Sequence, residues 1–402
     1  MDHLFIARQP IYDRNKAVMG YELLYRNSSQ NHAAITDGDT ASCETILNTF
    51  MHIGIDNIAG SALAFINLPR EFIVNDQLTP MFNEQAVLEI LEDIKPDEAV
   101  INGIKRLKNE GYQIALDDFL FKDEYKPFVE LADYIKFDIH ALSRCELIQQ
   151  FEKCKKYNVK LIAEKIESHE LYQVCYELGF DFFQGYFFCY PEMLKKKSLP
   201  SNKLVVLNLI QKLQNPQIES NELEEILAQD ITLTYKLLRY INSASFGLRR
   251  EVDSIKDAIV LVGINNLKNW VSLIMMSKII ESKPTELIIT GMIRGKMCEI
   301  LAQKNHPEIS HQMFIIGLFS VLDALMDQPL IDLLDSVILS TDIKLALLDF
   351  AGNQGKIYKY VLQYEKSNWQ ELNESDINAD EFIQAYLTSV NWADQSMQAL
   401  LD

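Results

Sequence analysis

Residues 113–118 read QIALDD, a short apolar run that ends in two neighbouring carboxylates, Asp117 and Asp118. An apolar run of this length is typical of a buried β-strand. The same arrangement, a strand-like run followed by a polar side chain, recurs along the first 190 residues. The runs are Gly20–Tyr25, Leu63–Leu68, Ala86–Ile90, Gln113–Leu116, Tyr134–Ile139, Lys160–Ala163 and Phe180–Phe188.

Amphipathic segments with helical spacing lie between several of these runs. Examples are Pro96–Glu110, Lys126–Ala132, Cys145–Tyr157 and Glu170–Leu178. Alternation of strand and helix signals favours an α/β fold with a parallel sheet. Seven or eight such units within about 190 residues predict a compact (β/α)₈ barrel of the TIM type.

The pattern changes after Tyr190 and Pro191. Residues 195–202 read KKKSLPSN, a basic and polar composition that is typical of a linker or domain edge. Beyond it, apolar residues recur at helical spacing in Leu204–Leu213, Glu222–Gln229, Leu233–Ser243, Ser254–Val262 and Asn265–Ile280. We therefore predict two domains, an α/β barrel over residues 1–195 and an all-α domain over residues 196–402.

Composition narrows the classes of function. The chain has 402 residues, 48% hydrophobic and 24% charged, and its 38 Lys and Arg against 57 Asp and Glu give a formal charge of −19. This acidity argues against binding of nucleic-acid polymers or anionic membranes, which need a basic face. No signal-peptide pattern, no spanning apolar run and no paired cysteine motif is found in the sequence. We expect a cytoplasmic protein with reduced thiols.

The polar residues at the strand ends carry the chemistry. They are Glu22, Asn67, Glu89, Asp117, Asp118, Lys136, Asp138, Glu164 and Gln184, with Glu167 three residues after Glu164. In a (β/α)₈ barrel these ends converge on one face, where active sites lie. Carboxylates and an amide gathered there form an all-oxygen cage suited to Mg²⁺ or Mn²⁺. One or two such ions would bind phosphate and activate water, and Lys136 would stabilise transition-state charge.

The order of these motifs resembles that of the EAL family from about residue 3 to 192. The matching segments are Gln9–Ile11, Tyr21–Arg26, Asn67–Pro69, Glu89–Glu92, Leu116–Phe119, Ile135–Asp138, Ala163–Glu167 and Gln184–Tyr186. Family members are cyclic di-GMP phosphodiesterases built on a (β/α)₈ barrel. The resemblance therefore implies hydrolysis of cyclic di-GMP to linear pGpG.

The resemblance also assigns roles to individual positions. It implies that the metal ligands are Glu22, Asn67, Glu89, Asp117 and Asp118. Lys136 resembles the catalytic lysine, and Glu164 and Glu167 match the paired glutamates that position metal or water. Gln9, Arg26 and Gln184 match positions that hold the guanine or phosphate of the substrate.

The family signature Glu-Ala-Leu reads Glu22-Leu23-Leu24 here, a minor change because the second and third residues are apolar. The sequence departs from the family pattern more seriously in two other places. Family members usually continue after the paired aspartates with a Gly-rich, Ser-containing loop that couples metal binding to dimerisation, whereas residues 120–125 here read LFKDEY. Without those glycines the loop cannot reach the same backbone conformations. The glycine between the paired glutamates is replaced by Lys165. Its ammonium either extends to solvent or stands near the carboxylates and competes with a metal.

The second domain resembles the HDOD domain, a helical relative of the HD phosphohydrolases. The resemblance rests on residues 227–244, 254–259 and 261–263, and it covers roughly residues 200–402. Ser320 and Val321 stand where a metal-binding relative carries His-Asp, and neither can replace those ligands. We interpret His306 and His311 as surface or capping residues. The domain is then expected to sense a signal or to bind a partner.

Three hypotheses follow. The first is a phosphodiesterase regulated by the HDOD domain, and the second is a weak or inactive EAL domain that senses cyclic di-GMP or serves as a scaffold. The third, a nucleic-acid-binding protein, fits poorly with the charge. The expected partners are cyclic di-GMP and an unidentified signalling protein that contacts the HDOD domain. The resemblance also implies a homodimer through the barrel, an expectation weakened by the altered loop.

Overall fold

The computed structural model of the chain describes residues 4–27, 54–75, 85–185, 206, 209–210, 212–213, 218–228, 231–242, 252, 254–277, 283–336, 339–373 and 375–401. The chain folds into two compact units, residues 1–187 and 188–402. The expected boundary between residues 195 and 196 falls outside the described ranges.

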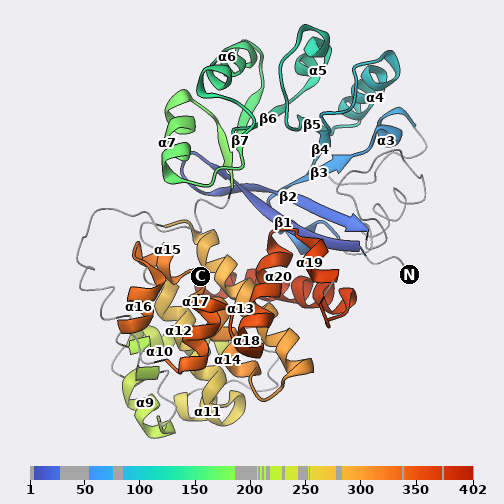
Figure 1. The fold of residues 1–402 in the computed structure, drawn as a ribbon. Coiled ribbons are helices and arrows are strands. Elements are labelled where there is room, and N and C mark those ends of the chain that lie inside the picture. The colour runs from blue at the N-terminus through green and yellow to red at the C-terminus, as the bar shows by residue number, and fades with distance from the viewer. Residues whose placement is uncertain are drawn as a thin grey trace. The chain divides into compact units, whose positions relative to one another are not determined.

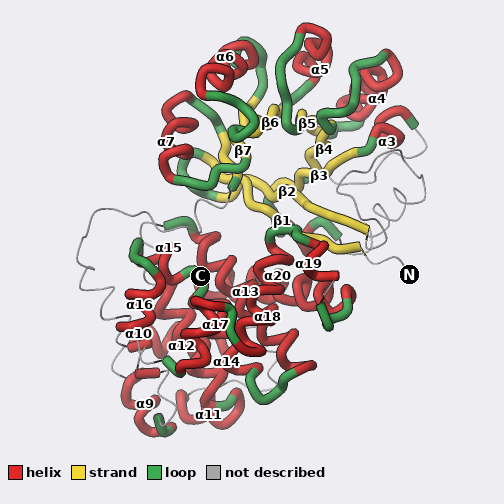
Figure 2. Tube along the Cα trace, in the orientation of Figure 1, coloured by secondary structure: helices red, strands yellow, loops and turns green. Residues whose placement is uncertain are grey.

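The first unit is a closed barrel of eight strands that follow one another in chain order. The strands are β1 (Leu4–Asp13), β2 (Val18–Asn27), β3 (Leu63–Leu68), β4 (Ala86–Ile90), β5 (Gln113–Leu116), β6 (Tyr134–Asp138), β7 (Lys160–Glu164) and β8 (Phe182–Gln184). Figures 1 and 2 show β1 to β7 arranged in a ring. Each strand from β2 to β7 is parallel to the next. The predicted barrel is thus confirmed.

The expectation of a wholly parallel sheet was wrong at β1, a strand that the apolar runs did not reveal. β1 is antiparallel to both of its neighbours, β2 and β8. A tight turn joins it to β2, and the Asp13 carboxylate holds this turn by accepting hydrogen bonds of 2.8 Å from the backbone N–H groups of Asn15 and Ala17. No crossover helix is needed, because antiparallel strands can be joined by a short hairpin.

Helices follow most of the parallel strands and lie around the outside of the barrel (Figure 1). They are α2 (Asp56–Ala59), α3 (Arg70–Val74), α4 (Glu98–Asn109), η2 (Asp123–Tyr125, a 3₁₀ turn), α5 (Lys126–Leu131), α6 (Arg144–Cys154) and α7 (His169–Leu178). Side chains at Asp97, Ser143 and Ser168 cap α4, α6 and α7 by accepting backbone N–H bonds. These caps fix where each helix begins, and so fix the length of the loop before it.

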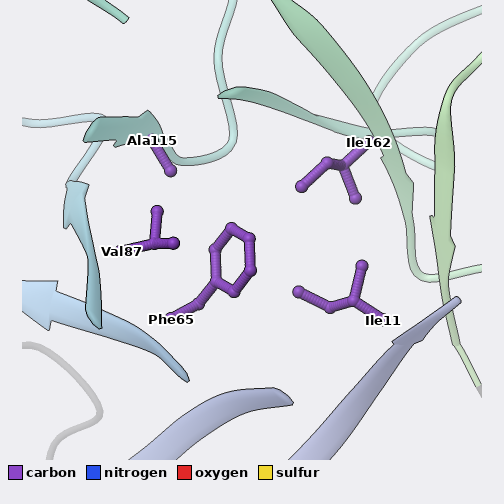
Figure 3. Packing of buried hydrophobic residues seen from close by; sticks show 5 residues of the cluster. All are labelled: Ile11, Phe65, Val87, Ala115 and Ile162. Atoms are coloured by element: carbon purple, nitrogen blue, oxygen red, sulfur yellow. The ribbon is translucent and has the colours of Figure 1, made fainter. Parts of the chain in front are cut away.

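The interior of the barrel is filled by side chains that point inward from alternate strand positions. Ile11, Phe65, Val87, Ala115 and Ile162 form a fully buried cluster, and Figure 3 shows the ring of Phe65 among the other four. Because successive strand residues face opposite sides, the residues two positions further along these strands also face inward. The next layer of inward-facing side chains therefore packs directly on this apolar layer.

The second unit consists of helices over its described residues (Figure 2). They are α9 (Ser220–Ala228), α10 (Ile231–Ile241), α11 (Ile255–Val262), α12 (Ile264–Ser277), α13 (Thr285–Asn305), α14 (Ser310–Phe319), α15 (Leu322–Met326), α16 (Leu330–Ser336), α17 (Thr341–Asp349), α18 (Gly352–Glu365), α19 (Trp369–Asn373) and α20 (Ala379–Leu401). The long helix α13 packs against α14, α18 and α20. Of the predicted helices, Leu204–Leu213 lies largely outside the described residues.

Among the described residues, no single helix combines the length and apolar character needed to cross a membrane. Helices α11 and α12 meet that test only as a pair, and the chain bends by 119° between them.

Candidate active site at the barrel mouth

The inward-facing layer above the core cluster is polar. Asn67, Glu89, Asp117 and Glu164 each lie two residues beyond a core residue of the same chain segment, namely Phe65, Val87, Ala115 and Ile162. Strand register places Asn67 beside Glu89, and Gln9 of β1 beside Glu22 of β2. The strand ends therefore bring these polar side chains together in one layer.

Lys136 of β6 lies at the centre of this layer and is fully buried. Its ammonium nitrogen Nζ is 2.6 Å from Oε1 of Glu164, 2.8 Å from Oε1 of Glu89, 3.0 Å from Oδ1 of Asp117 and 3.0 Å from Oε2 of Glu22. One ammonium thus faces four carboxylates from four other strands or their ends. The group retains a net negative charge when all four are ionised.

Two glutamine side chains form hydrogen bonds on one side of the site. Gln184 of β8 is buried, and its amide nitrogen donates to Oε2 of Glu22 at 2.6 Å and to Oε1 of Gln9 at 3.1 Å. These bonds orient Glu22 toward Lys136. They also link β1, β2 and β8, the three strands that close the barrel.

Burial and charge perturb the titration of this group. Desolvation raises the pKa of Glu89 well above its usual value, and it does the same for the pKa of Glu164. Desolvation opposes the charge of Lys136, but the carboxylates of Glu164, Glu22, Glu89 and Asp117 outweigh it and raise the lysine pKa well above its usual value. Lys136 is therefore a permanent cation. Its single positive charge cannot balance the negative charges of all four carboxylates.

Several buried oxygen atoms of the site accept no hydrogen bond from the described residues. They show whether the site is suited to a metal ion. Oε2 of Glu89, Oδ1 of Asn67 and Oε1 of Gln184 are buried without a hydrogen-bond partner among the described residues. In addition, carboxylate oxygens of Asp117, Asp118 and Glu164 lie within 4.8 Å of one another. Buried oxygens without donors, in a group with excess negative charge, are suited to a hard divalent cation.

Lys165 directs its ammonium toward the acidic groups, so the predicted alternative that places it near the carboxylates holds for its position. Nζ is 3.0 Å and 3.2 Å from the two carboxylate oxygens of Asp118, and 2.6 Å from Oδ2 of Asp138. Asp138 is a strand-end carboxylate outside the set of residues to which the sequence assigns a role. Its position in β6, two residues after Lys136, is the signal that could have identified it.

The predicted site residue Glu167 does not join the cluster. The side chain of Glu167 is 68% exposed, and it faces His140, whose Nε2 lies 4.0 Å from Oε2 of Glu167. Arg26 lies in β2, opposite Phe5 of β1, but its side chain lies outside the described residues.

The altered loop after Phe119 is held in place by hydrogen bonds and by an aromatic contact. The N–H of Phe119 donates to the carbonyl of Lys136, and its ring meets that of Tyr125 edge-on at 6.0 Å. The N–H of Phe121 donates to Oε1 of Gln150 in α6. A cavity of about 180 Å³ lies beside Asp117 and Asp118, lined on its other sides by residues of the loop and of the end of β4. The loop therefore forms one wall of a hollow next to the acidic group.

A glycine lets the ends of β7 and β8 approach closely. A Cβ atom at Gly185 would lie 2.1 Å from the carbonyl oxygen of Ile166, and Gly185 has φ +149°. The N–H of Ile166 donates to the carbonyl of Gln184 at 3.0 Å. Glu164, Lys165 and Gln184 are therefore held on closely packed segments of backbone.

The helical unit contains a partly buried ion pair beside the position expected for the missing metal doublet. The guanidinium of Arg294 bonds both carboxylate oxygens of Glu365, at 2.6 Å and 2.7 Å, and its Nη1 donates to Oγ of Ser320 at 3.0 Å. Val321 is fully buried. A fixed guanidinium beside Ser320 disfavours a metal cation there. His306 lies 3.6 Å from Glu308, and the side chain of His311 lies outside the described residues.

Comparison with known proteins agrees with this division of the chain. The EAL domain model matches residues 57–191, and the HDOD domain model matches residues 199–326. The cyclic di-GMP phosphodiesterase CdgJ of Vibrio cholerae is 32% identical over 371 residues, which cover 91% of this chain and 86% of CdgJ. The uncharacterized protein YuxH of Bacillus subtilis is 31% identical over 408 residues, covering 98% of this chain and 99% of YuxH.

Solved structures with an EAL domain are also similar. The YkuI protein of Bacillus subtilis, solved with the substrate c-di-GMP and calcium, is 19% identical with a TM-score of 0.39, covering 64% of this chain and 71% of YkuI. The two domain matches and the near full-length relatives show that the chain belongs to the family of proteins that join an EAL domain to an HDOD domain.

Proposed function

We propose that the barrel is a divalent-metal-dependent phosphodiesterase that hydrolyses cyclic di-GMP to linear pGpG. The proposal is supported by the full-length likeness to the phosphodiesterase CdgJ. The observation that carries it is the buried group around Lys136, in which four carboxylates share one ammonium while Oε2 of Glu89 and Oδ1 of Asn67 have no donor among the described residues. Such a group gains most from a further cation.

In this proposal Mg²⁺ or Mn²⁺ is held by the strand-end oxygens. The ligands would come from Glu22, Asn67, Glu89, Asp117 and Asp118. When bound, the metal supplies Lewis acidity to a phosphate oxygen and acidifies a water molecule. It also reverses the local charge, which lets an acidic protein accept a dianionic ligand.

The side chains of the chain have separate proposed tasks. Lys136 offsets the repulsion among the carboxylates and is placed to stabilise charge that develops on the phosphate. Gln184 orients Glu22 with its amide nitrogen, and its Oε1, which lacks a partner among the described residues, is an acceptor for a guanine N–H. Gln9 and Arg26 are proposed to contact the substrate. Glu164 and Glu167 are proposed to position metal or water.

Product analysis tests the proposal. Wild-type protein, Mn²⁺ and cyclic di-GMP are incubated and the nucleotides are separated by chromatography. We expect pGpG from wild type, and a loss of about a hundredfold or more in rate with Glu22→Gln, which removes one charge without changing shape. Glu152→Gln, an exposed carboxylate on α6, is the matched control and should keep the wild-type rate. A wild-type rate no higher than that of Glu22→Gln would refute the proposal.

A second function is favoured by one observation, the ion pairs of Lys165 with Asp118 and Asp138. These pairs place a cation among the groups expected to bind metal, as in a barrel that binds cyclic di-GMP without cleaving it. Calorimetry with Ca²⁺ present and absent separates the two functions. Binding of cyclic di-GMP together with absence of pGpG would favour the sensor.

The helical domain is proposed to be an interaction or sensing module that acts on the barrel. The support is the Arg294–Glu365 ion pair next to Ser320, which fills the place where metal ligands would be needed for chemistry. Its proposed partner is a signalling protein, and a homodimer through the barrel is a proposal as well. Size-exclusion chromatography with light scattering measures the oligomeric state directly.

A further inference from the structure

The two lysines at the barrel mouth contact their carboxylates in different ways. Lys136 contacts Oε1 of Glu164, Oε1 of Glu89, Oδ1 of Asp117 and Oε2 of Glu22. The other oxygen of Glu89, Oε2, is buried without a hydrogen-bond partner among the described residues. Lys165, in contrast, contacts both oxygens of Asp118, and it also contacts Asp138. The group around Lys136 therefore keeps Oε2 of Glu89 to offer to a metal ion, whereas both oxygens of Asp118 already contact an ammonium.

The backbone places the Lys165 ammonium. Lys165 has φ +58° and Asp118 has φ +41°, so both residues occupy the left-handed region that favours glycine. The following residue, Ile166, is bonded to Gln184 and packed against Gly185. Lys165 thus leaves β7 in a fixed and unusual direction, and backbone strain of this kind clusters at functional sites.

The position that Lys165 reaches is one that a metal would need. Asp118 belongs to the group of oxygens, with Asp117 and Glu164, that lie within 4.8 Å of one another. Without Asp118 this group retains two carboxylates, and both of these already contact Lys136. A divalent cation bound there would also face the positive charge of Lys165 at close range.

We propose that Lys165 is a built-in cation that removes Asp118 from the ligand set given under the proposed function, and that it keeps the neighbouring Asp138 from serving as a ligand. The mouth of the barrel then binds one divalent ion, through the side of the site formed by Glu22, Asn67, Glu89 and Asp117, in place of two. This inference rests on the proposed metal dependence of the barrel. It assigns Lys165 a positioning role, and it makes the number of bound ions a property of this side chain.

Counting bound Mn²⁺ tests the proposal without any assay of activity. The full-length protein is titrated with Mn²⁺, and the free ion is measured by electron paramagnetic resonance. We expect one tight Mn²⁺ for wild type. Lys165→Met, which keeps the length of the side chain but not the charge, should bind a second ion about tenfold or more tightly than wild type does. Two neighbouring Mn²⁺ ions would also give the broadened spectrum of a spin-coupled pair.

Three further variants separate charge from backbone effects. Lys16→Met is the matched control, because Lys16 also has φ +65° but lies in the turn between β1 and β2, away from the strand ends that carry the site. It should bind one ion. Lys165→Arg keeps the charge and should also bind one. Lys165→Gly suits the left-handed backbone and should bind two, which keeps the test valid if the methionine variant does not fold.

The outcomes distinguish this inference from the proposed function. Two ions of similar affinity in wild type, or one ion in both Lys165→Met and Lys165→Gly, would overturn the role of Lys165 and leave the phosphodiesterase proposal intact. Absence of any bound Mn²⁺ in wild type would overturn both.

Discussion

The ammonium of Lys136 lies 2.6 Å from Oε1 of Glu164, and both side chains are buried. The single positive charge of the lysine can balance one carboxylate in this way. The other three carboxylates around it keep an excess of negative charge. Without a bound metal, several carboxylates therefore lie close together in a buried site of the barrel. Several measurable properties depend on this arrangement.

Lys136→Met should destabilise the metal-free barrel by about 3–5 kcal/mol at pH 7, since it leaves buried carboxylates without a cation. Lys108→Met is the control, because its ion pair with Asp133 is about one-third exposed and should contribute about 1 kcal/mol or less. The three tryptophans, at positions 270, 369 and 392, all lie in the helical unit. Barrel stability should therefore be measured by hydrogen exchange of barrel peptides. Equal losses in both variants would contradict the prediction.

The stability of the metal-free barrel should fall as pH rises above 4.5, the ordinary pKa of a glutamate. Burial raises the pKa of Glu89 well above 4.5 in the folded chain, so the folded state binds more protons than the unfolded state between these two values. Stability is then lost with increasing pH by up to about 1.4 kcal/mol per pH unit for one such group. Glu89→Gln should flatten this slope in hydrogen-exchange measurements, and an unchanged slope would contradict the prediction.

The same shift in the pKa of Glu89 gives metal binding the opposite dependence on pH. A divalent ion needs the ionised carboxylate, so the apparent affinity for Mn²⁺ should increase with pH and binding should release protons. Calorimetry in two buffers of different ionisation enthalpy measures that release directly. An affinity for Mn²⁺ that is independent of pH between about 5 and 8 would show that Glu89 is not part of the metal site.

Gly185→Ala should disturb β7 and β8 together. The added Cβ would lie 2.1 Å from the carbonyl oxygen of Ile166, a distance that forces the backbone to move. Gly111→Ala is the matched control, since Gly111 also has positive φ (+96°) but nothing lies within 4 Å of the place that its added Cβ would take. We expect Gly185→Ala to cost about 2 kcal/mol more than the control. Hydrogen exchange should increase in peptides 160–167 and 180–185, and identical exchange in both variants would contradict the prediction.

Glu365→Gln should destabilise the helical unit by about 2–3 kcal/mol, because it removes the charge that the Arg294 guanidinium contacts through two nitrogens. Lys304→Met is the control, because Lys304 is 65% exposed in its pair with Glu381 and should contribute about 1 kcal/mol or less. Urea unfolding followed by tryptophan fluorescence measures both. If both variants lost the same stability, the Arg294 pair would have no special structural role.

The strands that were predicted to the residue share one property, an apolar run that contains a single polar residue. Leu63–Leu68, Ala86–Ile90 and Gln113–Leu116 match β3, β4 and β5 to the residue. β1 was missed because Arg8, Gln9 and Pro10 interrupt its apolar pattern. Arg8 is nevertheless buried, with its guanidinium 4.2 Å from the centre of the Tyr21 ring. Tertiary contacts of this kind cannot be read from local periodicity.

The residues that form the site could be predicted from the sequence, but only some of the contacts between them could. The alternation of strand residues brings Asn67, Glu89, Asp117 and Glu164 to one layer, and this follows from the sequence alone. The direction of Lys165 does not follow, since it depends on a left-handed backbone and on partners 27 and 47 residues away. The Arg294–Glu365 pair, separated by 71 residues, was likewise invisible to local patterns.

The antiparallel strand β1 has a consequence for the synthesis of the chain. The hairpin of β1 and β2 needs only local contacts, but the other edge of β1 must wait for β8, whose pairing residues Phe182–Gln184 are synthesised about 170 residues later. Until then the nascent hairpin presents an open edge, a feature that promotes wrong pairing. Closure of the barrel joins the two ends of this unit, so folding rate should be limited at that step. Ribosome-bound chains that stop before β8 should remain sensitive to protease, and those that extend beyond it should become protected.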